Sequence, residues 1–200
     1  MSENIFKHHY DITQKDRCRL NKHGSFVIWF TGLPCSGKST LANELDKTLH
    51  SKGIRSYVLD GHNIRKGLNS DLTFTVEDRK ENLRRIGHVA QLFTDAGIIC
   101  IAAFVAPLQE DRAQLKASIG SDQFIEIYLN TPIETCEERD IKGLYKKARN
   151  GEIKDFTGVN APYETPENPD LIIDTSKESM GVSIEKIMSH IHHKISINMQ

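Results

Sequence analysis

Residues 26–41 read Phe-Val-Ile-Trp-Phe-Thr-Gly-Leu-Pro-Cys-Ser-Gly-Lys-Ser-Thr-Leu. Within this stretch, Gly32, Gly37, Lys38 and Ser39 match the pattern G-x-x-x-x-G-K-[ST]. Glycines let the backbone curl until its N–H groups converge on an anion, and a helix that starts there adds the positive end of its dipole. The stretch therefore predicts a phosphate-binding loop, with Lys38 on the β- and γ-phosphates of ATP and the Ser39 hydroxyl on Mg²⁺.

The sequence on either side of the loop fits this prediction. Residues 26–30 form an apolar run typical of a buried strand, and Leu41, Leu45 and Leu49 recur on one helical face before Gly53. A Gly/Ser turn without a ligand is the alternative. The residues expected to contact ATP are Gly32, Leu33, Pro34, Cys35, Ser36, Gly37, Lys38, Ser39 and Thr40.

Composition sets the class of protein. The 200 residues are 38% hydrophobic and 26% charged, which describes one domain with a sizeable core. A formal net charge of -1 argues against nucleic acid or a membrane surface as the main partner, so we expect a small substrate. The four cysteines lack C-x-x-C spacing, and the N-terminus lacks an apolar signal region, so we expect a cytoplasmic protein.

Strand-like and helix-like stretches alternate along the chain after the loop. We expect strands at residues 56–59, 98–105, 124–129 and 171–173, and helices at 75–96, 108–119, from 131 to about 139, and at the C-terminus. Thr131 and Pro132 are expected to be the N-cap and the first residue of their helix. The alternation predicts an α/β fold of the P-loop NTPase type, with a parallel five-stranded sheet flanked by helices.

The predicted domain covers residues 25–200 and carries a lid at about residues 140–160. Residues 1–24 are polar with little periodicity, and we expect an extended arm with one helical turn. Residues 140–158 are basic, aromatic and interrupted by glycines, which suits a mobile lid that closes over phosphates. The alternative for these residues is a plain amphipathic surface helix.

Polar residues follow the predicted strand at residues 56–59, namely Asp60, His62, Asn63 and Arg65. The carboxyl ends of strands are where open α/β sheets bind ligands, so we expect these side chains beside the phosphate-binding loop. A solvated turn is the alternative. The helix predicted to start after Thr75 carries several arginines in its first turns, which indicates an anionic ligand there, although such a cluster is commonly a solvated face.

Several of these stretches together resemble the adenylyl-sulfate kinase (APS kinase) family over about residues 24–190. The motifs are Trp-Phe-Thr-Gly-Leu at 29–33, Leu-Asp-Gly at 59–61 with Asn63 and Arg65, Asp-Arg-Lys-Glu-Asn at 78–82, Lys-Gly-Leu-Tyr-Lys-Lys-Ala-Arg at 142–149, and Phe-Thr-Gly at 156–158. The resemblance implies transfer of the γ-phosphoryl group of ATP to the 3′-hydroxyl of adenosine 5′-phosphosulfate (APS). It also implies a homodimer and a functional link to an ATP sulfurylase.

The resemblance assigns roles to residues. Phe74 and Phe156 would sandwich the acceptor adenine, Arg65, Arg79 and Asn82 would hold its phosphosulfate and ribose, and Arg139 would lie near the ATP base. Lys142 would reach the acceptor or the transferring phosphoryl group, so that Lys38, Asp60, His62 and Lys142 form the expected catalytic set. The expected substrate-binding residues are Asp60, Asn63, Arg65, Phe74, Arg79, Asn82, Val105, Ala106, Lys142, Phe156 and Thr157.

The chain departs from the family pattern in four places. His62 stands where the family commonly has aspartate, and its neutral imidazole can still accept a proton. Ala106 stands where the family has a serine proposed as a phosphorylated intermediate, so transfer is expected to be direct. Pro34-Cys35 replaces small residues of the loop, which makes Cys35 a candidate oxidation-sensitive position, and Asn160 replaces a usual aspartate.

Two other functions stay open at this point. His62 and Ala106 both fall on the acceptor side, so a relative that phosphorylates the ribose hydroxyl of another nucleotide fits the sequence. A catalytically silent nucleotide-binding protein also fits. Turnover assays with APS and with a panel of other nucleotides, together with ATP binding, distinguish all three.

Overall fold

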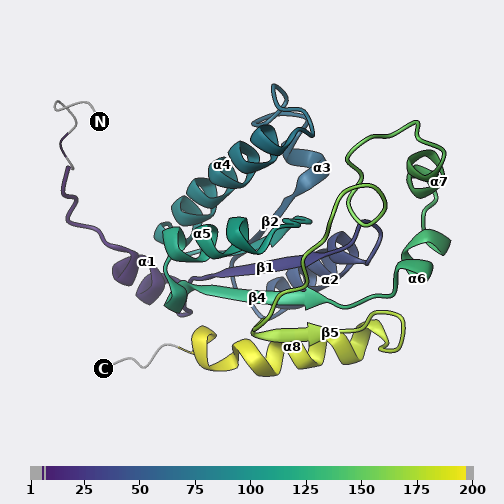
Figure 1. The fold of residues 1–200 in the computed structure, drawn as a ribbon. Coiled ribbons are helices and arrows are strands. Elements are labelled where there is room, and N and C mark those ends of the chain that lie inside the picture. The colour runs from purple at the N-terminus through teal and green to yellow at the C-terminus, as the bar shows by residue number, and fades with distance from the viewer. Residues whose placement is uncertain (1–5, 7, 197–200) are drawn as a thin grey trace.

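The computed structural model describes residue 6 and residues 8–196, and Figure 1 shows their arrangement. The predicted arm therefore lies partly outside the described residues, at positions 1–5 and 7, as does the end of the predicted domain at 197–200. The strands are β1 (Val27–Gly32), β2 (Ser56–Asp60), β3 (Ile99–Ala103), β4 (Phe124–Leu129) and β5 (Leu171–Ile173). The helices are α1 (Gln14–Asn21), α2 (Lys38–Ser51), α3 (Gly61–Ile64), α4 (Val76–Asp95), α5 (Gln109–Ile119), α6 (Ile133–Glu138), α7 (Leu144–Arg149) and α8 (Met180–Ile195), with a 3₁₀ turn at Ser121–Gln123.

The five strands form one parallel sheet in the order β2-β3-β1-β4-β5, which confirms the predicted fold class. The strand β1 is central and pairs with β3 on one side and β4 on the other. All six of its residues are buried, as expected for a strand covered on both faces. The phosphate-binding loop therefore starts from the most constrained strand of the sheet.

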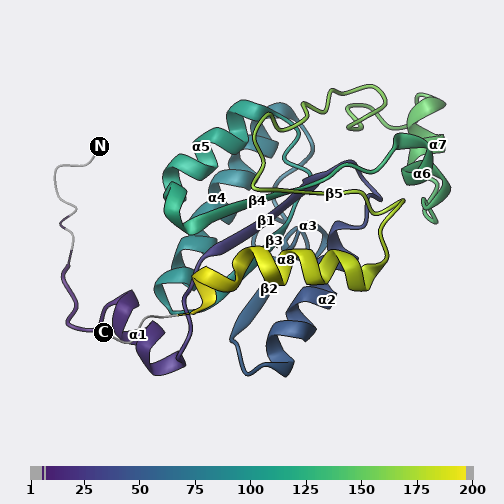
Figure 2. The same cartoon turned by 90° about the horizontal axis from the view of Figure 1, so that it is seen from below.

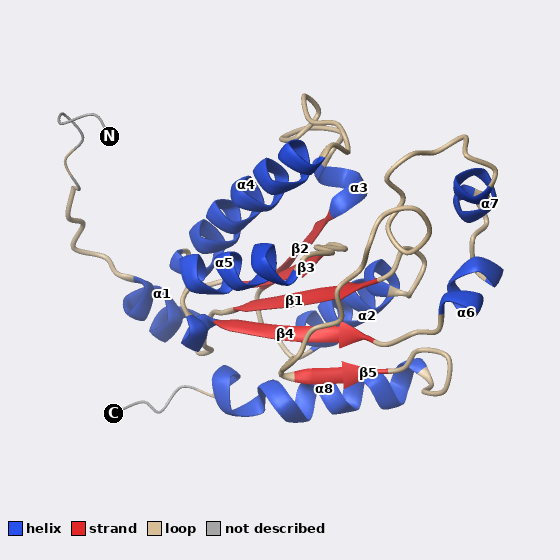
Figure 3. Cartoon of the chain, in the orientation of Figure 1, coloured by secondary structure: helices blue, strands red, loops and turns tan. Residues whose placement is uncertain are grey.

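Helices cover both faces of the sheet (Figures 2 and 3). Alternate residues of β1 face opposite layers: Ile28 and Phe30 pack with the leucines of α2 and the isoleucines of α8, whereas Val27 and Trp29 pack with α4 and α5. The apolar face of α2 consists of Leu41, Leu45 and Leu49, as predicted from their spacing. The two faces of the sheet thus carry two separate hydrophobic cores, which fix the positions of the strand ends from which the phosphate-binding loop starts.

Two local predictions at helix starts need correction. Thr131 is not the N-cap of α6, because the cap is Pro132 and the helix begins at Ile133. The Thr131 hydroxyl instead contacts the phosphate-binding loop, a tertiary contact that outweighs its capping preference. The arm contains an eight-residue helix, α1, rather than a single turn, because Thr13 and Asp16 form a reciprocal capping box.

The long helix α4 begins as predicted. Its N-cap is Thr75, whose hydroxyl accepts a hydrogen bond from the Asp78 backbone N–H. Figure 1 shows α6 and α7 beyond the carboxyl ends of β1 and β4, with a long irregular connection from α7 back to β5. The predicted lid thus contains a short helix, α7, inside an otherwise irregular segment. In the described part of the chain, no helix has the length and apolar character needed to cross a membrane.

Candidate active site

The phosphate-binding loop connects β1 to α2 and owes its shape to two glycines. Gly32 has φ +147°, and a Cβ atom there would lie 2.9 Å from the Leu129 carbonyl oxygen. Gly37 has φ +98° and is the N-cap of α2. Side chains are rarely tolerated at such φ values, so glycine is required at both turns. The first turn of α2, which contains Ser39 and Thr40, directs its free N–H groups into the loop.

The Lys38 ammonium lies inside the curl of this loop. Its Nζ donates to the carbonyl oxygens of Gly32 at 2.9 Å and Leu33 at 2.7 Å. Burial of the side chain lowers the pKa of Lys38 to about 8, which means that the charge is poorly solvated in the protein alone. A phosphate group would supply the compensating negative charge that this lysine lacks.

The outer side of the loop is held by Thr175, which the sequence did not single out, and by Thr131, which was expected only as an N-cap. The hydroxyls of Thr131 and Thr175 donate to the Ser36 carbonyl oxygen at 3.3 and 2.9 Å. Arg139 donates in turn to the Thr175 hydroxyl at 2.7 Å and to its carbonyl oxygen at 2.9 Å. The predicted ATP-side residue Arg139 therefore lies one contact away from the loop.

Ser39, Asp60 and His62 meet at the start of α2. The Ser39 hydroxyl donates to Asp60 Oδ2 at 2.5 Å, and the His62 N–H donates to Asp60 Oδ1 at 2.8 Å. Burial would raise the pKa of Asp60, but these hydrogen bonds hold it below its ordinary value, so the carboxylate is charged. The His62 ring is largely exposed, with Nδ1 3.3 Å from Asp60 Oδ1.

The oxygen atoms of Ser39 and Asp60 fit a magnesium site. Mg²⁺ prefers hard oxygen ligands and keeps several of its waters, so one hydroxyl and one carboxylate beside bound phosphates form a suitable donor set. Of the predicted polar residues, His62 and Asn63 lie in α3 rather than in a simple solvated turn, whereas Asp60 ends β2 and caps this helix with its side chain, and Arg65 is its C-cap. Asn63 lies exposed in α3.

Arg65, Arg79 and Phe74, all three predicted to bind the acceptor, form a second cluster. The guanidinium carbons of Arg65 and Arg79 lie 4.3 and 5.6 Å from the centroid of the Phe74 ring. Arg79 donates to the Phe74 carbonyl oxygen at 2.8 Å and to the Asp155 carbonyl oxygen at 2.6 Å. It also reaches the Thr157 hydroxyl at 3.3 Å. One guanidinium thus joins the segment that carries Phe74 to the lid segment that carries Phe156.

Asn82 projects from α4 next to this cluster and is fixed by a residue that the sequence analysis missed. The buried Asn69 Nδ2 donates to Asn82 Oδ1 at 3.0 Å. The amide nitrogen of Asn82 is thereby left to donate elsewhere, which suits contact with anionic or hydroxyl oxygens. Asn69 carried no sequence signal, because its partner lies on a separate element.

The segment after β3 has an unusual backbone conformation at Ala106. Ala106 has φ +41°, and its carbonyl oxygen accepts a hydrogen bond of 2.6 Å from Arg112. Arg112 is itself buried in an ion pair of 2.9 Å with Glu126. The Thr31 hydroxyl donates to the Val105 carbonyl oxygen at 2.6 Å. Of the two predicted acceptor-side residues, Val105 is therefore anchored to β1 through Thr31, and Ala106 is anchored to α5 through Arg112.

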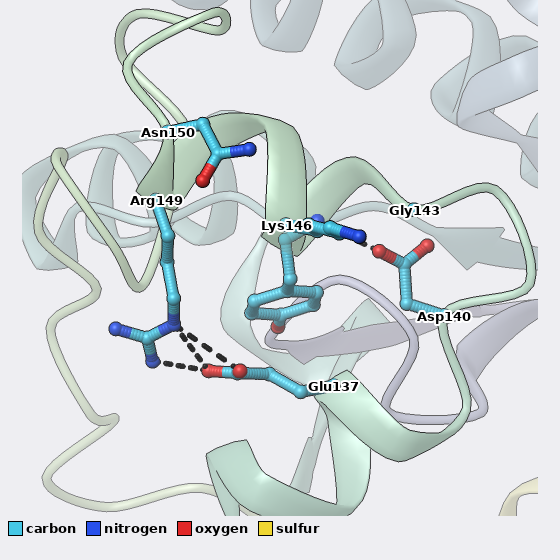
Figure 4. A pocket seen from close by; sticks show the side chains of 7 residues that line it. Glu137, Asp140, Gly143, Lys146, Arg149 and Asn150 are labelled. Atoms are coloured by element: carbon cyan, nitrogen blue, oxygen red, sulfur yellow. Dashed lines mark hydrogen bonds and ion pairs between the residues drawn. The ribbon is translucent and has the colours of Figure 1, made fainter.

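The first residues of the lid contact the phosphate-binding loop. A cavity of about 440 Å³ lies between α6 and α7. Figure 4 shows the side chains that line it, with the Arg149–Glu137 ion pair at its side. Cys35 Sγ lies 3.9 Å from Asp140 Oδ1, and Lys142 lies exposed in the turn before α7. Burial and the nearby Asp140 raise the pKa of Cys35, which disfavours the reactive thiolate expected of an oxidation-sensitive cysteine.

Asn160 shapes the lid segment around Phe156. Its Oδ1 accepts a hydrogen bond of 2.6 Å from the Phe156 N–H, and its Nδ2 donates to the Ile153 carbonyl oxygen at 2.8 Å. An aspartate could make the first of these bonds but not the second. Asparagine at this position therefore holds both sides of the turn that presents Phe156.

Comparisons with known proteins point to one family. A family model for adenylylsulphate kinase matches residues 24–174. An adenylyl-sulfate kinase of Lactiplantibacillus plantarum is 50% identical over 198 residues, which cover 98% of this chain and 96% of the relative. The structure of the Mycobacterium tuberculosis APS kinase CysC in complex with AMPPNP and APS has a TM-score of 0.80 and 44% identity, and the match covers 85% of this chain and 98% of that chain.

A third match concerns assembly. The hexameric APS kinase from Thiobacillus denitrificans has a TM-score of 0.65 and 31% identity. The match covers 86% of this chain but 30% of that longer chain.

Proposed function

The chain belongs to the adenylyl-sulfate kinase family, and we propose that it transfers the γ-phosphoryl group of ATP to the 3′-hydroxyl of APS, giving 3′-phosphoadenylyl sulfate and ADP. The observation that carries this proposal is the pairing of an intact phosphate-binding loop with the Arg65–Phe74–Arg79 cluster, which the Arg79 guanidinium ties to the lid. The loop suits the donor nucleotide, and the arginine cluster suits an anionic acceptor.

We assign the donor side to Gly32–Thr40. The backbone N–H groups at the start of α2 would bind phosphate oxygens, and Lys38 would stabilise the charge that spreads over the γ-phosphoryl group during transfer. Ser39 and Asp60 would hold Mg²⁺, which when bound supplies charge neutralisation between the phosphates. Phosphoryl transfer needs mainly positioning and charge stabilisation, which this set of residues can provide.

We assign the acceptor side to residues around α4 and the lid. Phe74 and Phe156 would stack on the adenine, while Arg65, Arg79 and Asn82 would hold the phosphosulfate and ribose. Asp60, Asn63, Val105, Ala106 and Thr157 would line the path of the reacting hydroxyl, and Lys142 would approach the transferring group. Arg139 would lie near the ATP base. It contacts the Thr175 hydroxyl, which in turn bonds to the Ser36 carbonyl oxygen of the loop.

A direct assay tests the proposed function. Purified protein with Mg-ATP is expected to release ADP only when APS is added and to form 3′-phosphoadenylyl sulfate in equal amount. Turnover with another nucleoside phosphate but not with APS would favour the alternative acceptor. ATP binding without turnover on any acceptor in the panel would favour the silent nucleotide-binding protein.

We propose that transfer is direct, without a phosphorylated side chain. The support for this is Ala106, which has no hydroxyl to phosphorylate at the position where the family resemblance places a serine. Incubation with γ-labelled ATP, followed by APS, is expected to label the nucleotide product and not the protein. Labelled protein that loses its label on addition of APS would contradict direct transfer.

His62→Ala is expected to lower kcat by about tenfold to a hundredfold while leaving the dissociation constant of ATP nearly unchanged. The reason is the position of the ring beside Asp60, where a neutral imidazole could accept the proton of the acceptor hydroxyl. Single-turnover rates and ATP titrations check this. His88→Ala, an exposed histidine on α4, is the control, and an unchanged rate for His62→Ala would remove His62 from the mechanism.

We propose a cytoplasmic homodimer supplied with APS by an ATP sulfurylase, because the acceptor must come from a reaction that joins sulfate to an adenylyl group. All four cysteines are free thiols, which fits a reducing compartment. We also propose a division into an arm at residues 1–24 and a kinase domain at residues 25–200.

A further inference from the structure

Tyr145 is a buried residue that contacts both halves of the site. It lies in α7, and its side chain and backbone are 2% exposed. The hydroxyl donates to the Pro34 carbonyl oxygen of the phosphate-binding loop at 2.9 Å. The ring meets the Phe156 ring edge to face, with centroids 4.9 Å apart. The two nucleotide sites are thus joined through one rigid side chain.

The surroundings of Tyr145 keep this link in one geometry. Its backbone N–H donates to Asp140 Oδ2 at 2.7 Å, at the edge of the cavity shown in Figure 4. Burial raises the pKa of the Tyr145 hydroxyl, so it stays protonated and remains a donor to Pro34. A tyrosine has two rotatable side-chain bonds, and packing at both ends leaves little freedom for either contact to change alone.

We propose that Tyr145 is a positioning residue that couples the binding of the two nucleotides. This inference rests on the proposed function and adds a thermodynamic link to it. The Pro34 carbonyl holds the Tyr145 hydroxyl and the Tyr145 ring holds Phe156, so a shift of the loop on phosphate binding would be passed on to the ring proposed to stack on the acceptor adenine. Because coupling free energies are reciprocal, APS must strengthen ATP binding by the same factor by which ATP strengthens APS binding.

The hydroxyl is the part of Tyr145 that can be removed with the least damage. Tyr145→Phe keeps the ring against Phe156 and removes only the hydrogen bond to the loop. Tyr128→Phe is the matched control, because the Tyr128 hydroxyl donates to Asn130 Oδ1 at 3.1 Å at the end of β4 and its ring stacks on Tyr163. Both variants therefore lose one hydroxyl and one hydrogen bond of a well-packed tyrosine.

Calorimetric titration measures the coupling. The dissociation constant of APS is determined with and without Mg-AMPPNP, an ATP analogue that does not transfer its phosphoryl group. We expect the analogue to tighten APS binding by a factor on the order of 10 in the wild type and in Tyr128→Phe, and by a factor of about 1 in Tyr145→Phe. The reverse titration must give the same factors.

The outcomes separate this inference from the proposed function. A wild-type enzyme that turns over APS but shows no coupling, or a Tyr145→Phe variant that keeps the full factor, would overturn the role of Tyr145 alone. Failure of the wild type to bind APS would overturn both. Phe156→Leu keeps the Tyr145 hydroxyl and is expected to lose the coupling as well, which tests the link even if Tyr145→Phe folds poorly.

Discussion

Lys38→Met is expected to lower kcat by about 10³-fold, which corresponds to roughly 4 kcal/mol of lost transition-state stabilisation. Methionine keeps an unbranched apolar stem as far as Cε but removes the ammonium group from the curl of the loop. Lys38 Nζ lies within 2.9 Å of two loop carbonyl oxygens, where a bound phosphate would be its counter-charge. Steady-state ADP release with saturating Mg-ATP and APS checks the effect.

The matched control for this prediction is Lys47→Met on the same helix. Lys47 lies on the exposed side of α2 and pairs with Glu44 at 2.8 Å, so its loss is expected to change kcat by less than about twofold. Thermal unfolding of both variants shows whether the loop carbonyls tolerate the loss of Lys38. A folded Lys38→Met enzyme that keeps kcat within tenfold of the wild type would contradict the assigned role.

Arg79→Gln is expected to reduce kcat/KM for APS by about 10²-fold, with little change in the KM of ATP. Arg79 ties the Phe74 backbone to the lid at Asp155 and Thr157, and in the proposed site its fork would also bind the anionic acceptor. Glutamine removes the charge and cannot span these contacts. Initial rates at varied APS and fixed saturating ATP, and the converse, separate the two effects.

Arg84→Gln is the control for the acceptor-side prediction. Arg84 lies five residues further along α4, is exposed, and pairs with Glu81 at 2.7 Å, so its loss is expected to leave both KM values nearly unchanged. Equal losses for ATP and APS in Arg79→Gln would show that Arg79 acts through the fold as a whole. That result would remove it from the acceptor site.

The elements that the sequence predicted well are those with a strong local pattern. The buried strand β1 and the leucine stripe of α2 follow from hydrophobic periodicity, and the start of α4 follows from the capping of Thr75. The predicted helix start at Thr131 was wrong, because the hydroxyl of that residue bonds to Ser36, which is 95 residues away in the sequence. Local capping rules do not include such a partner.

The parts of the site that the sequence could not predict are held by long-range contacts. Thr175 is 139 residues from Ser36, and Tyr145 is 111 residues from Pro34, so neither contact has a local signature. Asn69 is a similar case, because its role depends on the orientation of one amide on α4. Motif spacing located the phosphate-binding loop and the arginines of α4. The residues that support the loop and Asn82 through long-range hydrogen bonds can be identified only in the folded chain.

A crystal structure of the protein with Mg²⁺, AMPPNP and APS tests the central claim most directly. We expect the γ-phosphate beside Lys38, the 3′-hydroxyl of APS in line with it, and the APS adenine between the rings of Phe74 and Phe156. Separation of these two rings by other protein segments, or an acceptor held away from Lys38 in a fully liganded and closed molecule, would contradict the account.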